Sequence, residues 1–464
     1  RINYDFNRKY FLSANVRRDG YSAFANKWGT FYGGSAGWNI SEESFWNEAS
    51  FANVFSSFRL RGSYGMVGNF SGIGSYANLS LYNGGLYGNE ASIFYAQAGN
   101  RDLTWEKSTK LDLGFNAGFF NDRLNLELTY YKNDITDLIL AEPQAPSRGI
   151  PGNSILTNVG SMVNKGIEVS LGGSIVSKSD FTWSTNFNIT TVKNEVTSLA
   201  NNNADILVAT GGLESPSMVR VGQSIGSFFV VPTDGINPEN GRRIFVLNDG
   251  TRVQYNHAAA AASRWTKVAD GTNSRAASQA VDGVIIGPAL PKFFGGFDNT
   301  FRYKGFDLNV LLYFSGGNYV YNGTKAGLHD NRNWNNAKDA LNRWQQKDDN
   351  AEWPRVVFGD NVSNGSAFPI SNNVEKGDFI KARNMSLGYT LPSSLVSRIN
   401  ISSARVYVAA LNAFTITKYS GFDPEIQSNN GGTTTDQVIN AGPSVDRNAA
   451  GLARTINVGL NIGF

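Results

Sequence analysis

One pattern recurs along almost the whole chain: large apolar residues alternate with small or polar ones over stretches of about ten residues. The last stretch, TINVGLNIGF, shows it. One set is Ile456, Val458, Leu460, Ile462 and Phe464, and the other is Thr455, Asn457, Gly459, Asn461 and Gly463. Side chains along a β-strand point alternately to opposite faces, so each stretch predicts a strand with one apolar face. We therefore expect an all-β protein.

About thirteen such strands are expected. They lie near residues 1–6, 9–19, 30–41, 55–67, 107–120, 123–140, 160–177, 180–194, 291–304, 305–322, 378–392, 402–417 and 454–464. The pair KLDLGFNAGFF and LNLELTYY, separated by the polar turn NDR, has the form of an antiparallel hairpin. Neighbouring strands in this scheme are consecutive in the sequence, as in a meander.

The expected connections alternate in length. Short ones fall at 7–8, 42–54, 121–122, 178–179, the junction of residues 304 and 305, and 393–401. Long ones fall at 20–29, 68–106, 141–159, 195–290, 323–377 and 418–453. Short turns on one rim and long loops on the other are typical of outer-membrane barrels.

Composition excludes several classes of protein. No run approaches the ~18 consecutive apolar residues of a membrane-spanning helix. The chain has no Cys, which excludes disulfides, zinc–thiolate sites and thiol nucleophiles, and only two His. The net charge of +3, from 41 basic and 38 acidic residues, is too balanced for a nucleic-acid surface. We expect no cofactor, no metal site and no catalytic residue, so the chain is not expected to be an enzyme.

The chemistry of the two faces favours a membrane barrel over a soluble sandwich. Bulky Leu, Val and Phe occupy one face, whereas the other carries Gly, Ser, Asn, Thr and charged residues. An apolar exterior and a wet interior fit this division, although large aromatic side chains could also fill a sandwich core. The charged candidates for the lumen-facing surface are Arg59, Arg61, Asp112, Glu127, Glu168, Asp298, Arg302 and Asp307, with Lys381 on the same type of face.

Several phrases resemble the barrel of SusC/RagA-type TonB-dependent transporters. They include YFLSANVRRDGYSAF (10–24), WGTFYGGSAGWNISEESFW (28–46), FRLRGSYGMVGN (58–69), NVGSMVNKGIEVSL (158–171), FIKARNMSLGYTLP (379–392) and ARVYVAALNAFTITKYSGFDPEI (404–426). The resemblance implies a transmembrane barrel of about 22 strands around a plug. Residues 1–464 would supply the C-terminal ~13 strands of that single domain, leaving roughly nine strands, the plug and the TonB box to a preceding segment.

The resemblance also implies function and partners. It indicates TonB-dependent import of an oligosaccharide or peptide across the outer membrane, with a SusD-like lipoprotein as a lid and the TonB complex as the energy source. Assembly machinery, the lipid bilayer and a second transporter–lipoprotein pair are further expected contacts, and nucleic acid is not. The terminal strand fits an assembly signal formed by Asn457, Gly459, Ile462 and Phe464. A passive porin or adhesin-type barrel and a soluble all-β glycan-active enzyme are the alternatives.

Long loops near 68–106, 195–290, 323–377 and 418–453 are expected on the extracellular side. Their aromatic candidates for ligand or partner contact are Tyr255, Trp265, Trp334, Trp344 and Trp353, although packing within the loops is the more ordinary role. Acidic loop residues lack the spacing of a calcium loop. The pairs Lys165-Gly166 and Asn240-Gly241 are predicted turn or bulge positions at which Gly adopts positive φ. A short loop helix is expected within residues 337–346.

Overall fold

The structure is a computed structural model of the 464-residue chain. It describes all residues except 71–72, 209–213, 333, 398–400 and 426–441. Parts of the expected loops at 68–106, 195–290, 323–377 and 418–453, and of the connection at 393–401, therefore lie outside the described residues. No helix among those described is both long and apolar enough to cross a membrane.

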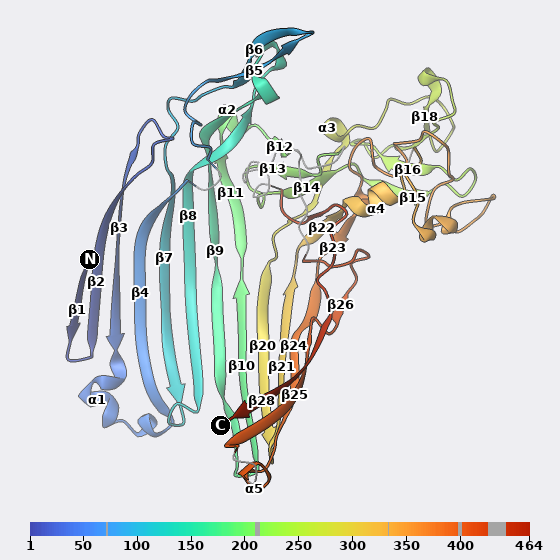
Figure 1. Cartoon of the computed structure of the whole chain (residues 1–464). Helices are drawn as coiled ribbons and strands as arrows, with labels where there is room; N and C mark the ends of the chain where they lie inside the picture. Colours follow the sequence, from blue (N-terminus) through green and yellow to red (C-terminus); the bar gives the residue numbers. More distant parts are fainter. Residues whose placement is uncertain (71–72, 209–213, 333, 398–400, 426–441) are drawn as a thin grey trace.

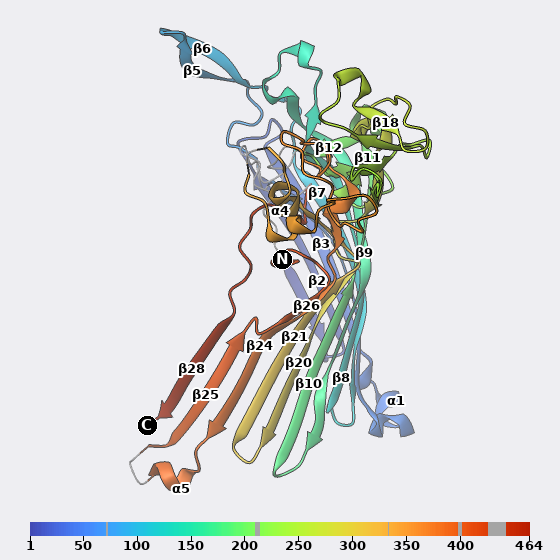
Figure 2. The ribbon, with the colours of Figure 1, turned by 90° about the vertical axis from the view of Figure 1, so that its right-hand side faces the viewer.

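One large antiparallel sheet forms a curved wall (Figures 1 and 2). Its strands, in spatial order, are β1 (Ile2–Phe6), β2 (Tyr10–Gly20), β3 (Trp28–Asn39), β4 (Phe55–Asn69), β7 (Glu106–Phe119), β8 (Leu124–Pro143), β9 (Ser154–Ser177), β10 (Phe181–Thr191), β20 (Phe293–Tyr303), β21 (Phe306–Gly316), β24 (Phe379–Thr390), β25 (Ser403–Leu411) and β28 (Thr455–Gly463). Two short strands join it: β11 (Lys193–Leu199) pairs with β9, and β26 (Thr415–Thr417) pairs with β24.

The wall confirms the predicted all-β meander. Its main path has the thirteen expected strands, each paired with the next wall strand along the chain. The wall does not close, because none of the described strands pairs with the free edge of β1 or of β28. Both edge strands therefore leave backbone N–H and C=O groups without a strand partner among the described residues.

Smaller sheets lie at the long-loop end of the wall (Figure 1). They are β5 (Leu81–Tyr87) with β6 (Glu90–Gln97); β12 (Ile206–Val208), β13 (Ser217–Val219), β14 (Ser227–Val230) and β19 (Val284–Gly287); β15 (Thr233–Ile236), β16 (Arg243–Val246), β17 (Arg252–Tyr255) and β18 (Trp265–Lys267); and β22 (Tyr319–Asn322), β23 (Val374–Lys376) and β27 (Val445–Asp446). The strands of these sheets lie in the expected long connections at 68–106, 195–290, 323–377 and 418–453, except β22. That strand lies within residues 305–322, which were expected to form a single strand but divide into β21 and β22.

Helices are few and short in the part of the chain that the structure describes. The α-helices are α1 (Ser44–Asn47), α2 (Ala200–Asn203), α3 (Gln279–Asp282), α4 (Gly323–Leu328) and α5 (Ser393–Val396). Single 3-10 turns occur at Ile40–Glu42, Ser50–Asn53, Pro146–Arg148, Pro151–Asn153, Ala261–Ser263, Lys338–Asn342 and Ser371–Asn373. The helix expected within 337–346 is the 3-10 turn Lys338–Asn342.

The two predicted glycine positions behave differently. Gly241 has φ of 69°, as expected of a turn. The expectation for Gly166 was wrong, because this residue lies in the middle of β9. A Cβ on Gly166 would come within 1.8 Å of the carbonyl oxygen of Thr191. Glycine is therefore needed there for close approach of two strands rather than for positive φ.

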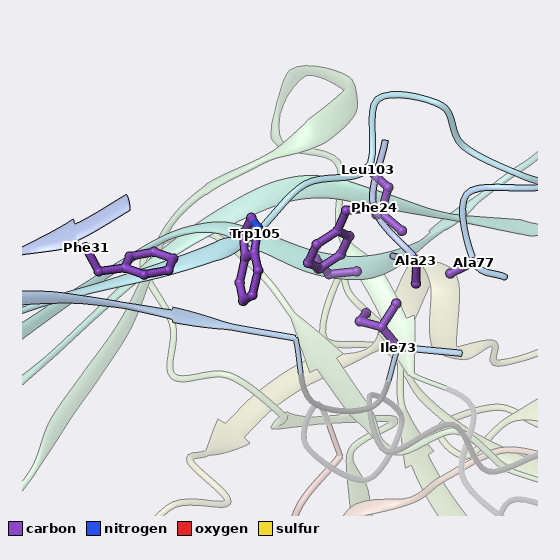
Figure 3. Close-up of a cluster of buried hydrophobic side chains, with 8 residues drawn as sticks. Ala23, Phe24, Phe31, Ile73, Ala77, Leu103 and Trp105 are labelled. Carbon is purple, nitrogen blue, oxygen red and sulfur yellow. The ribbon is translucent and has the colours of Figure 1, made fainter. Parts of the chain in front are cut away.

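The buried hydrophobic clusters lie at the long-loop end. One contains Phe24, Phe31, Leu103 and Trp105, and Figure 3 shows the Trp105 ring between those of Phe31 and Phe24. The ring centroids of Phe31 and Trp105 are 5.5 Å apart, and those of Phe24 and Trp105 are 5.3 Å apart. Other clusters hold the loop sheets together. In the part of the wall near the short connections, many large apolar side chains are instead exposed.

The rim with the short connections contains a hydrogen-bonded carboxylate. Glu43 accepts hydrogen bonds from Lys9 Nζ at 2.9 Å, from the Tyr10 hydroxyl at 2.7 Å and from Trp38 Nε1 at 3.2 Å. These bonds, that of Lys9 foremost, lower the pKa of Glu43 to about 2. The cluster joins the β1–β2 turn to the end of β3.

Candidate functional site: the polar face of the wall

The wall has two chemically distinct faces. The strand register places apolar residues of neighbouring strands opposite one another on one face, and polar residues opposite one another on the other. One row on the apolar face runs across six strands through Trp183, Phe301, Leu308, Leu387, Val408 and Val458. Residues directly opposite each other in an antiparallel pair point to the same side. The row is therefore continuous, and Leu387, Val408 and Val458 are exposed. Leu113, on the same face, is 50% exposed.

The polar face carries a network across β4, β7 and β8. The Arg61 guanidinium donates to Asn116 Oδ1 at 3.0 Å and forms an ion pair with Glu127. Ser63 donates to Asp112 at 3.1 Å. Arg61 and Glu127 lie on strands separated by β7, so their side chains must converge above the sheet. Such convergence is expected on the concave side of a curved wall.

Arg59, the next candidate on β4, takes a different partner. Its guanidinium lies over the ring of Phe11, 4.7 Å from the centroid. Gly37 on the intervening strand leaves room for it, because a Cβ there would lie 3.1 Å from the Arg59 side chain. Small residues on the polar face thus provide space for long charged side chains.

A second polar network spans β20, β21, β24 and β25. Asn309 donates to Asp298 at 2.7 Å and accepts from Asn384 at 3.3 Å. Asp307 pairs with Arg405, whose Nε lies 2.8 Å from Oδ1. Arg302 is directly opposite Asp307 in the register. Sequence reasoning identified the acidic residues but missed Arg405, although its position in an alternating strand was a usable signal.

Glu168 lies on the same face but apart from both networks. It is opposite Thr129 on one side and Thr190 on the other, and it is exposed. Five of the eight predicted charged residues thus have polar side-chain partners, namely Arg61, Asp112, Glu127, Asp298 and Asp307. Arg59 instead contacts an aromatic ring, Arg302 is placed only by its register opposite Asp307, and Glu168 stands apart. A hollow between the two networks is lined by Ser57, Asn116, Asn125, Ser170 and Asn186, with Glu127 and Asp298 at its sides. Its hydroxyl, amide and carboxylate groups suit hydrogen bonding to a hydrophilic solute.

A buried charge cluster ties a long loop to this face. Lys381, 1% exposed, lies 2.8 Å from Asp423 and also contacts Glu425, which pairs with Arg383. Its location on β24 was expected, but its carboxylate partners are 42 and 44 residues further along the chain. No local pattern links residues at that separation.

The loop aromatic candidates occupy different environments. Tyr255 and Trp353 are buried, at 6% and 3% exposure, and Trp265 packs against Tyr255 with ring centroids 5.1 Å apart. Trp344 donates from Nε1 to the Pro238 carbonyl at 2.9 Å. Trp334 is 65% exposed. In this arrangement Trp334 is the candidate most accessible to a ligand or partner.

The terminal strand β28 pairs along its length with β25. Asn457 and Gly459 lie on the polar face, where the Tyr407 ring covers Gly459 so closely that a Cβ would be 2.3 Å from it. Ile462 and Phe464 belong to the apolar face, and Phe464 is 94% exposed. The assembly role of these four residues stays a prediction. Among the described residues, no three His, Cys, Asp or Glu side chains are grouped to hold a metal ion.

Comparisons with known proteins place the wall in context. The sequence pattern of the family described as TonB dependent receptor-like, beta-barrel matches residues 1–281. TonB-dependent receptor P3 of Formosa agariphila is 30% identical over 471 residues, which cover 100% of this chain and 45% of that protein. TonB-dependent receptor SusC of Bacteroides thetaiotaomicron is 27% identical over 496 residues, which cover 100% of this chain and 43% of that protein.

Solved structures of a peptide transporter also superpose on this chain. The structure of the RagAB peptide transporter superposes with a TM-score of 0.78 at 26% identity, covering 100% of this chain and 47% of that chain. The RagAB peptide importer in its "open-open" state superposes with a TM-score of 0.76 at 25% identity, covering 100% and 46%. The chain thus spans about half the length of the relatives that it matches.

Proposed function

Because the chain belongs to the TonB dependent receptor-like β-barrel family, we propose that it is the C-terminal barrel portion of a SusC/RagA-type importer. The chain is an outer-membrane protein of SusC type. The proposal is that the complete protein draws a hydrophilic nutrient through the barrel at the expense of TonB-transmitted energy. It requires no covalent chemistry from this chain.

The polar face supports this proposal most directly. Its hydroxyl, amide and charged groups would line the lumen, whereas the aligned apolar rows would face lipid. A closed barrel of about 22 strands would contain roughly nine strands besides the thirteen of this wall. The substrate we propose is a peptide or an oligosaccharide, since one matched structure is that of a peptide transporter and both solutes present hydrogen-bonding groups.

A SusD-like lipoprotein is the proposed lid. The hairpin of β5 and β6 projects from the long-loop end (Figures 1 and 2), and its Leu86, Tyr87 and Ile93 side chains are 74%, 86% and 79% exposed. An isolated two-stranded hairpin is marginally stable in water, and apolar side chains on it favour a protein contact. Leu86→Ser with Ile93→Ser should weaken co-purification of the lipoprotein encoded beside the full-length gene.

Uptake by cells that carry the full-length protein tests the import proposal. Labelled peptides and oligosaccharides would be supplied with and without a protonophore, and uptake that stops with the protonophore is expected. Uptake that continues would instead indicate a passive porin. Glu127→Gln should reduce uptake at unchanged surface abundance, whereas Arg123→Gln, in the short turn before β8, should not. Equal uptake by both variants would contradict a lumen role for the network around Arg61 and Glu127.

A further inference from the structure

Three lysines lie side by side on the apolar face, near its long-loop end. Lys132 on β8 is opposite Lys165 on β9, and Lys165 is opposite Lys193 on β11. Directly below them on the same face, Tyr130 is opposite Ile167. Like charges aligned across neighbouring strands repel each other. A row of three lysines therefore calls for compensating negative charge.

The protein supplies only part of that charge. Lys132 Nζ lies 2.8 Å from Asp134, and Lys193 Nζ lies 3.2 Å from Glu195. Within the described part of the chain, Lys165 forms no side-chain hydrogen bond or ion pair. Lys193 remains 66% exposed at its side chain. The middle lysine and the outer surface of the row are open to an external anion.

The position of the row along the wall indicates which anion. Lys165 is twelve residues above the end of β9 at Ser177. At about 3.4 Å per residue and a strand tilt of roughly 35–45°, it lies about 30 Å above the lower end of β9. The apolar bands of outer-membrane barrels are about 25 Å tall. The lysines therefore lie just above the band, where lipid headgroups begin.

A hollow adjoins the row at Lys193. The pairing of β10 with β20 runs up to Thr191 opposite Phe293, and Pro291, just before β20, has no amide hydrogen to extend it. The hollow beside this point is lined by Lys193, Lys292, Gln223, Ser224 and Leu290, among others. The lining of this hollow thus combines two lysines and polar residues with the apolar Leu290 and Pro291.

We propose that the lysine row and this hollow form a binding site for the phosphate group of a lipid in the leaflet next to the long loops. The ammonium groups of Lys132, Lys165 and Lys193 neutralise the phosphate, and the acyl chains lie on Tyr130 and Ile167. Lysine binds phosphate well as a point charge, and clusters of basic residues at a membrane surface recognise anionic headgroups. The proposal rests on contact of the apolar face with lipid, and not on the transported substrate.

Native mass spectrometry of the full-length protein in a neutral detergent tests the site. The probes are phosphatidic acid and the diacylglycerol with the same acyl chains, which differ only by the phosphate. We expect retention of phosphatidic acid and little retention of diacylglycerol. At about fivefold per lysine, the K132Q/K165Q/K193Q variant should bind phosphatidic acid roughly a hundredfold more weakly. Lys110→Gln is the matched control, because Lys110 lies opposite Asn133 on the polar face at the same height.

The single variant Lys165→Gln is a milder test than the triple variant, because it leaves no carboxylate of the protein without its ion-pair partner. It should weaken phosphatidic acid binding about fivefold. Heat-modifiable migration on a gel would confirm that each variant is folded. Equal binding of phosphatidic acid by the wild type and the folded triple variant would overturn the proposal. Displacement of the lipid by inorganic phosphate at equal concentration would also overturn it, because the site would then recognise a free anion. Lipid binding is measured without transport, so failure of the import proposal would be separately visible.

Discussion

Leu171 tests the division between the two faces most sharply. This residue lies halfway along the lower part of β9, six residues from Lys165 and six from the strand end at Ser177. At about 3.4 Å per residue and a tilt near 40°, it is about 15 Å from either end, close to the middle of the proposed membrane band. Leu171→Arg should therefore cost about 2–4 kcal/mol of folding free energy, the range for a cation at the midplane.

Two further variants on the same strand provide the comparison. Ile167→Arg places the same cation near the upper interface and should cost only about 0–1 kcal/mol. Ser170→Arg places it on the polar face opposite Glu127, where it can be solvated and paired, and should cost little. The wild-type exposure of Leu171, 37%, shows that no protein core covers it.

Urea unfolding of the full-length protein in lipid vesicles, followed by tryptophan fluorescence, would give these free energies. The expected order of destabilisation is Leu171→Arg, then Ile167→Arg, with Ser170→Arg close to wild type. If Ser170→Arg were as costly as Leu171→Arg, the assignment of the faces would be refuted. If Leu171→Arg and Ile167→Arg cost the same, the apolar face would not lie across a membrane.

Three other outcomes are expected. The hydrogen bonds that lower the pKa of Glu43 stabilise the folded protein fully above the unfolded pKa of about 4.5, and this stabilisation is lost as the pH falls towards 2. The difference in unfolding midpoint between wild type and Glu43→Gln should therefore shrink over that pH range. Lys381→Met should lower the free energy of unfolding by up to about 3–5 kcal/mol, because it leaves the Asp423 carboxylate buried without its partner, and should expose the loop around Asp423 to hydrogen exchange. The double variant Lys381→Met with Asp423→Leu should recover most of that loss. Unchanged hydrogen exchange in the single variant would contradict this. Gly459→Ala should cost about 1–3 kcal/mol by displacing the Tyr407 ring, and Tyr407→Ser should relieve that cost in an unfolding titration.

The strands of the wall were accessible from the sequence because their signal is local. Alternation between Leu124, Leu126 and Leu128 and the polar residues between them is visible within five residues, and the short turns fix which strand follows which. The same alternation assigned Arg61, Asp112 and Glu127 to one face. It could not reveal that Arg61 reaches Glu127 across an intervening strand, because that contact depends on sheet curvature.

The loops were far less accessible. The cluster that buries Tyr255 also contains Val231 and Ile370, which are bridged although they lie far apart in the sequence. Gly166 was predicted at a turn or bulge with positive φ, whereas the tertiary structure uses it for close strand contact. Packing between distant segments overrode the local preference in both cases.

The sequence by itself determined that this chain is a meander of about thirteen two-faced strands, since side-chain alternation and turn residues act over a few neighbours. Only the tertiary structure decided which side chains meet: the register that aligns Lys132 with Lys165 and Lys193, the contact of Lys381 with Asp423, and the interior of the loop sheets. Those features join residues that are distant in the chain. Their free energy depends on distance in space, which the folded backbone alone sets.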